Sequence, residues 1–187
     1  MLMRGLRPAL LGLAVLASPA FAQDIDSAYT KIDYDDCVLV DADEFGANFA
    51  CPGYKGYPLY IAEGDLRMFV SFGFGAPQEM AAHQTVPAFN TIGDTLEWRL
   101  VETETGWRPF AAILRYFTQT GDGPEPDGQG LVVTKIAPGE TCQIAQTDAL
   151  VPPPAHPPAR PFPDRLAPVF HFTMDAMPVL PDSMPPD

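Results

Sequence analysis

The sequence predicts a mainly-β domain, an antiparallel sandwich or a partly open barrel with one or two short helices. Three observations lead to this fold class: apolar and polar residues alternate with a period of two, helical periodicity is weak, and turn residues separate short segments. Short antiparallel neighbours at this spacing are typical of sandwiches and barrels, which the pattern alone does not separate.

Seven strands are expected. In the clearest one, Leu66, Met68 and Val70 share one face while Arg67 points to the other. Residues 109–117 are apolar on both faces, which suits a central strand. The predicted strands are residues 37–40, 57–62, 65–73, 95–101, 109–117, 131–136 and 141–147.

The connections between these strands predict hairpins and little helix. Glu63-Gly64 and residues 103–106 are expected to be hairpin turns. Residues 24–34 could hold a helical turn or two, and residues 77–84 another, with a proline in its first turn.

Residues 1–22 are predicted to be a secretory signal peptide. Arg4 and Arg7 precede a short apolar core at 8–17, and small residues at 20 and 22 suit a signal peptidase. That core is about half the ~20 residues needed to span a bilayer, and no later stretch approaches this length. The mature chain is therefore expected in the periplasm or outside the cell, without a membrane span.

Proline separates a domain at 23–150 from a tail at 151–187. The chain has 22 prolines, and 12 of them lie in the last 37 residues. Three interpretations of the tail remain open: a disordered or polyproline II segment, an apolar segment that packs on the domain or recruits a partner, and an altered reading frame.

The charge of the chain limits its partners. The formal net charge is −13, which is the wrong sign for a protein that binds nucleic acid or an anionic membrane surface. An acidic protein of this kind would be steered toward a basic target, so a basic envelope protein is the expected partner.

Three cysteines in an exported chain predict a disulfide. Cys37 and Cys51 are the expected pair, because they are close in sequence and bracket an acidic turn; pairs with Cys142 stay open. Cys142 would then be a buried thiol, an intermolecular bridge or a nucleophile.

No pattern in the sequence predicts a catalytic residue, a metal site or a cofactor. The acidic stretch 33–44 lacks the EF-hand spacing, and the loop 121–130 is expected to be mobile. The motif G-x-S-x-G is absent. Paired carboxylates for glycoside cleavage stay open in a chain with 24 acidic residues.

Two groups of residues are candidates for binding. The first is the set of charged residues within predicted strands, which form either cross-strand ion pairs or a groove for an acidic or polar ligand. This set is Asp65, Arg67, Glu97, Arg99 and Arg115. The second is the glycine-rich loop CPGYKGY at 51–57, which would display Tyr54, Lys55 and Tyr57 as a contact surface or serve as a tight connection.

The segments CPGYKGYPLYIAEGDLR, LEWRL, FAAILRYF and LVVTKI with a following Cys resemble small exported proteins of Gram-negative bacteria that have no assigned function. The resemblance covers residues 27–150 and implies a recurring domain, but no activity. A looser likeness to small β-structured periplasmic inhibitors of lysozyme rests on size, export, a disulfide and β content.

These observations favour a non-catalytic binding or inhibitory module that acts on an envelope protein or a polar ligand. One alternative is an envelope hydrolase with paired carboxylates. The other is a structural or stress-linked envelope protein.

Overall fold

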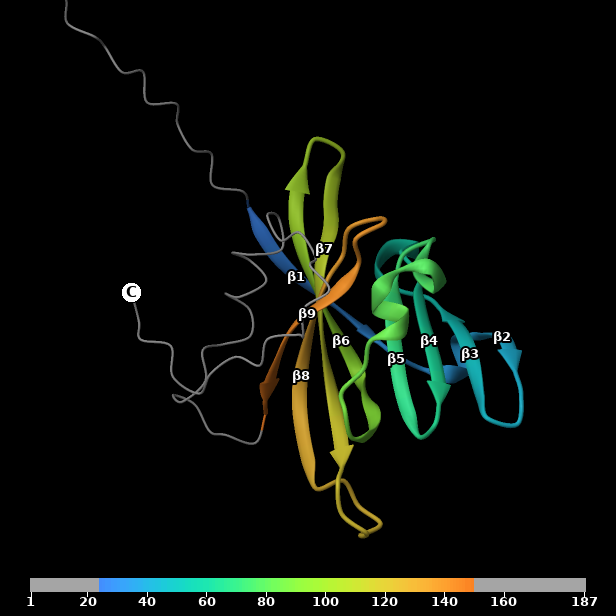
Figure 1. Ribbon diagram of the computed structural model, residues 1–187. Coiled ribbons are helices and arrows are strands. Elements are labelled where there is room, and N and C mark those ends of the chain that lie inside the picture. Colours follow the sequence, from blue (N-terminus) through green and yellow to red (C-terminus); the bar gives the residue numbers. More distant parts are fainter. Residues whose placement is uncertain (1–23, 150–187) are drawn as a thin grey trace, which may run out of the picture.

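Two antiparallel sheets pack against each other around one core in the computed structural model, which describes residues 24–149 (Figure 1). The five-stranded sheet has the order β1 (Ile25–Lys31), β6 (Phe89–Thr103), β7 (Gly106–Gln119), β8 (Gly128–Lys135) and β9 (Cys142–Asp148). The four-stranded sheet has the order β2 (Val38–Ala42), β3 (Gly46–Cys51), β4 (Leu59–Gly64) and β5 (Arg67–Phe72). The predicted mainly-β antiparallel fold is confirmed.

The helical content of the described chain is limited to short 3-10 turns. These are η1 (Tyr34–Asp36), η2 (Tyr54–Gly56), η3 (Ala76–Gln78) and η4 (Met80–His83). The last two replace the helix predicted at 77–84, and Pro77 lies in the first turn as expected.

The core lies between the two sheets. Trp98 is fully buried at its centre and meets Phe72 of the other sheet edge to face, with ring centroids 5.5 Å apart. Leu59 and Ile61 from β4 and Leu96 from β6 are also buried. Each such side chain contributes about 1.5–3 kcal/mol relative to an exposed one, so this layer carries most of the stability.

All seven predicted strands appear, with shifted ends. The hairpin between β4 and β5 is confirmed, but its turn is Asp65-Leu66 and not Glu63-Gly64, because Gly64 still pairs with Arg67. The hairpin at 103–106 is confirmed by the pairing of Thr103 with Gly106.

Two strands were not expected. The helical prediction for 24–34 is wrong: residues 25–31 form β1, which pairs with β6, and the Trp98 indole donates a hydrogen bond to Thr30 Oγ1 at 2.9 Å. β3 occupies part of the expected acidic turn. Its Gly46 lies so close to β4 that an added Cβ would be 2.0 Å from the Glu63 carbonyl oxygen.

The predicted signal peptide at 1–22 and the predicted tail at 151–187 lie outside the described residues. Within residues 24–149, no helix is both long and apolar enough to cross a membrane.

Candidate functional site

The loop that follows β3 is anchored by a disulfide. The sulfur atoms of Cys37 and Cys51 lie 2.06 Å apart, which confirms the expected pair. The next residues form η2, in which Lys55 has φ of +47° and Gly56 has φ of +85°. This left-handed backbone turns the chain sharply and leaves Lys55 exposed.

Close packing holds the loop on the core. An added Cβ at Gly53 would lie 2.1 Å from the Tyr57 carbonyl oxygen and 2.8 Å from the Trp98 ring, so only glycine fits. The Tyr57 ring meets Trp98 at 6.1 Å and Phe74 at 6.2 Å, both edge to face. The aromatic side chains of this loop are therefore fixed before any ligand arrives.

Around this loop is a surface hollow of about 290 Å³, which we call the aromatic hollow. Three segments far apart in sequence form it: the η2 loop, the residues after β5, and the β6–β7 hairpin. Its lining residues are Tyr54, Lys55, Gly56, Tyr57, Phe74, Thr105, Gly106, Trp107, Arg108 and Pro109. Phe74 is the most exposed of the large apolar residues within 24–149, with 86% of its surface exposed.

The aromatic hollow also holds two cations without acidic partners. Of the seven lysine and arginine residues in 24–149, Lys55 and Arg108 form neither an ion pair nor a side-chain hydrogen bond. The Lys55 ammonium lies 5.3 Å from the centre of the Tyr54 ring. Burial raises the pKa of the Tyr57 phenol, the charge of Arg108 opposes that rise, and the Glu79 carboxylate adds to it. The hollow is therefore lined by two cations and no carboxylate, on a strongly acidic chain.

The charged residues predicted on strands do not line this hollow, and they do not share one surface. Arg67 pairs with Asp65 at 2.7 Å beside the β4–β5 turn. Arg99 is 7% exposed on β6, where it contacts Glu97 at 3.5 Å and also hydrogen-bonds Ser27 of β1. The residues therefore form ion pairs and not a ligand groove, but the pairs are local, within β6 or beside the β4–β5 turn, and not between strands as expected.

Arg115 is on β7 and donates a hydrogen bond to Gln129 of β8. It lines a different hollow, with Ile92 to Thr95 and Phe117. The predicted binding set thus divides over several places, and Tyr54, Lys55 and Tyr57 are the members that share one concave surface.

A third hollow of about 610 Å³, which we call the apolar groove, is lined by residues of both sheets. Its lining residues are Tyr34, Phe49, Glu63, Leu66, Met68, Phe89, Asn90, Thr91, Phe117, Gln119, Gly121 and Pro126. Leu66 is 65% exposed at its rim and has φ of +59°, in the left-handed region that a leucine rarely adopts. Burial raises the pKa of Tyr34, and the nearby Glu63 carboxylate adds to the rise.

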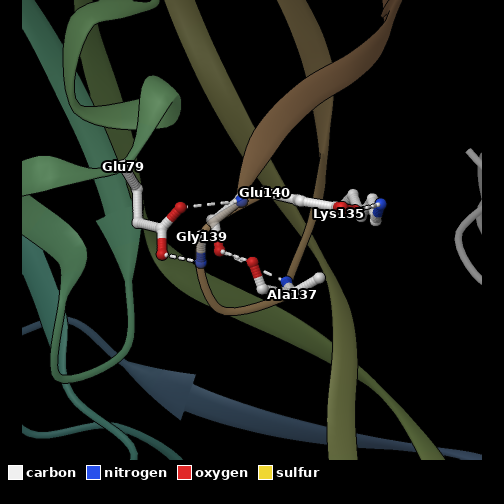
Figure 2. Close-up of polar contacts among 6 residues, drawn as sticks. Glu79, Lys135, Ala137, Gly139 and Glu140 are labelled. Atoms are coloured by element: carbon white, nitrogen blue, oxygen red, sulfur yellow. Dashed lines mark hydrogen bonds and ion pairs between the residues drawn. The ribbon is translucent and has the colours of Figure 1, made fainter. Parts of the chain in front are cut away.

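A buried carboxylate joins the segment between the sheets to the β8–β9 turn. Figure 2 shows Glu79 beside Gly139, whose backbone N–H donates to Glu79 Oε1 at 2.6 Å; the Thr141 N–H donates to Oε2 at 2.9 Å. Glu79 is only 8% exposed, and both of its oxygens accept backbone hydrogen bonds. Its role is therefore structural: it holds the turn in place.

The chemistry available elsewhere is limited. Cys142 is a free thiol with no exposed surface, and burial raises its pKa, so the buried-thiol interpretation is confirmed. No group of three or more metal-ligating side chains occurs within residues 24–149. Among the residues that line the aromatic hollow and the apolar groove, Glu63 is the one carboxylate.

Phe74, Trp107 and Arg108 were missed by the sequence analysis. The signal that could have drawn attention to Phe74 is its position between Gly73 and Gly75, directly after an apolar strand. Comparison with protein-family models, curated proteins and solved structures finds no match. The resemblance to small exported proteins therefore stays a prediction.

Proposed function

We propose that this protein is an exported, non-catalytic binding or inhibitory module whose contact site is the aromatic hollow. The observation that carries the proposal is the pairing of fixed aromatic rings with two unpaired cations, Lys55 and Arg108, in one concavity. Tyrosine, tryptophan and arginine are the residues that contribute most to binding energy at protein interfaces.

The two cations of the aromatic hollow limit the chemical class of ligand that it can bind. Lys55 and Arg108 attract an acidic or polar group, and an arginine side chain offers a planar fork to a carboxylate. Phe74 and Trp107 add apolar area beside it. The ligand is therefore an envelope protein segment or small molecule that presents an acidic group next to an apolar or aromatic one. A basic partner stays an expectation from the net charge of the chain.

Export is part of the same proposal. A disulfide between Cys37 and Cys51 is a bond that persists in oxidising compartments. The periplasm or the cell exterior agrees with the predicted signal peptide at 1–22.

The test is affinity capture from a periplasmic extract, with the mature chain as bait, at low and moderate salt. Two matched variants accompany it: Phe74→Ser in the hollow and Phe45→Ser away from it, at phenylalanines that are 86% and 76% exposed. We expect a captured partner to be lost with Phe74→Ser and kept with Phe45→Ser.

A second pair of variants tests the cations. Lys55→Ala with Arg108→Ala removes the unpaired charges, whereas Lys31→Ala removes an exposed lysine that pairs with Asp94. We expect the double variant alone to weaken capture. Absence of any specific partner at both salt concentrations, or equal capture by all variants, would contradict the proposal.

The alternatives lack a supporting observation. The hydrolase would need two carboxylates facing each other across a cleft. The apolar groove is lined by Glu63, the hollow beside Arg115 by Asp94, and the aromatic hollow by no carboxylate, so none of the three has a pair. A structural or stress-linked role would not require the aromatic hollow and does not account for it.

A further inference from the structure

The five-stranded sheet has an outer face that points away from the four-stranded sheet. Strand pairing defines it, because directly paired residues lie on the same side of a sheet. Arg99, Ala111 and Lys135 form one row across β6, β7 and β8. Ile113, Val133 and Ala145 form the next row across β7, β8 and β9.

These six residues alternate with residues of the core. Trp98 and Ala112 precede and follow them along β6 and β7 and lie in the core cluster against the four-stranded sheet. The six side chains must therefore point the other way.

The outer face is nevertheless buried. Ala111, Val133 and Ala145 have no exposed surface, Ile113 and Lys135 are 5% exposed, and Arg99 is 7% exposed. Arginine and lysine are rarely buried to this degree unless they are paired, and here Arg99 contacts Glu97 and Lys135 contacts Glu140. These pairs do not explain why the alanine and valine side chains between them have no exposed surface. An apolar patch flanked by two buried cations therefore has a cover.

The described elements supply only part of this cover. In Figure 1, strands β2 to β5 stand on one side of the five-stranded sheet. The segment η3–η4 contacts β5 and the start of β9, and the Ala81 N–H donates to the Thr141 carbonyl at 3.0 Å. At the β9 end of the outer face, Met80 of η4 packs against the cluster that contains Ile113, Val133 and Ala145. Among residues 24–149, no partly buried apolar side chain packs on the neighbouring cluster of Val101, Phe110 and Ala111.

We propose that residues 150–187 cover this outer face and form a third layer of the fold. The chain enters this segment just after β9, an edge strand of the same sheet. Its 38 residues reach much farther than the width of four strands, about 15 Å at ~4.8 Å per strand spacing. Between Phe162 and Leu180 it has nine large apolar side chains.

The apolar character of this segment, and not its charge, makes it a suitable occupant. Arg99 already pairs with Glu97 at 3.5 Å and Lys135 with Glu140 at 2.7 Å, so the covered surface that needs a partner is the apolar one. A covered sheet face also makes the segment part of the folded unit, which disfavours an altered reading frame.

Photo-crosslinking of the full mature chain tests the proposal. Tyr29 lies opposite Glu97 on β1, at the rim of the outer face, and is 57% exposed. In a Cys142→Ser background, Tyr29→Cys is labelled with benzophenone maleimide, irradiated and mapped by mass spectrometry. The matched control is Val38→Cys on β2, which is 67% exposed on the other sheet.

We expect crosslinks from position 29, and none from position 38, to peptides within 150–187 of the same molecule. Crosslinks confined to residues 24–149, or formed to a second copy of the chain, would overturn the proposal.

A second test measures how fast a thiol reagent labels cysteines introduced into the full-length chain. Ala111→Cys reports on the outer face, and Ser71→Cys reports on β5, where η4 contacts the strand. Replacing Phe162, Phe170 and Phe172 by aspartate should raise the labelling rate at position 111 by at least about tenfold and leave position 71 unchanged. An unchanged rate at position 111 would contradict the third layer.

Discussion

The two sheets differ in how their surfaces are buried. In the four-stranded sheet, all five residues of the edge strand β2 are exposed, among them Val38, Leu39 and Val40 at 67%, 56% and 59%. In the five-stranded sheet, residues on both faces of the central strands are buried, including Arg99 and Lys135.

This difference shows that the two sheets are stabilised by different means. The central strands of the five-stranded sheet are held by packing on two sides. Strand β2 buries no side chain and is held by its pairing with β3 and by the disulfide next to its first residue. An exposed apolar edge of this kind is a surface at which other strands can pair.

The largest expected effect comes from the shared core. Trp98→Ala should lower the free energy of unfolding by about 3–5 kcal/mol, because it removes a fully buried ring between the sheets. Val38→Ala on the exposed edge should change it by less than about 0.5 kcal/mol. Urea denaturation measures both, and similar losses would contradict the contrast between the two regions.

Removal of the disulfide should have the next largest effect. A double Cys37→Ala, Cys51→Ala variant should lose about 2–4 kcal/mol, the usual range for such crosslinks. Because β2 has little else to hold it, backbone amide exchange should rise most in residues 34–42, while β6 to β8 stay protected. An increase spread evenly over both sheets would argue against separate means of stabilisation.

The Glu79 contact should matter less, since it is a polar link at the edge of the core. Glu79→Gln leaves one backbone N–H facing a side-chain amide and should cost about 1–3 kcal/mol. Faster amide exchange at Gly139 and Thr141 would locate the loss. The control is Glu44→Gln, an exposed acid, for which we expect no measurable change.

The sequence predicts the strands that alternate in polarity or are apolar on both faces, and it misses those built from small residues or residues of similar polarity. In β1, the core-facing Ala28 and Thr30 are hardly more apolar than the outward Ser27 and Tyr29. In β3, Gly46 and Ala47 are small because β4 approaches closely at Gly46. Long-range pairing, which no local pattern encodes, decides both strands.

The candidate site is likewise predictable only where its residues are neighbours in the sequence. The composition of the loop 51–57 marks Tyr54, Lys55 and Tyr57. Phe74 and Arg108 reach the same hollow only through the packing of the two sheets. Alternation correctly places Arg67 and Arg99 opposite the core, but it cannot show that they belong to different sheets.

The smallest effect is a gain at the β4–β5 turn. Asp65 and Leu66 have φ of +51° and +59°, a turn that glycine and asparagine adopt at lower cost. Leu66→Gly should therefore be more stable than Leu66→Ala by about 1 kcal/mol, because the two variants lack the same exposed side chain and differ in backbone strain. Thermal and urea unfolding of the pair measure the difference. Equal stabilities of the two variants would mean that the left-handed backbone at Leu66, on the rim of the apolar groove, costs no measurable free energy.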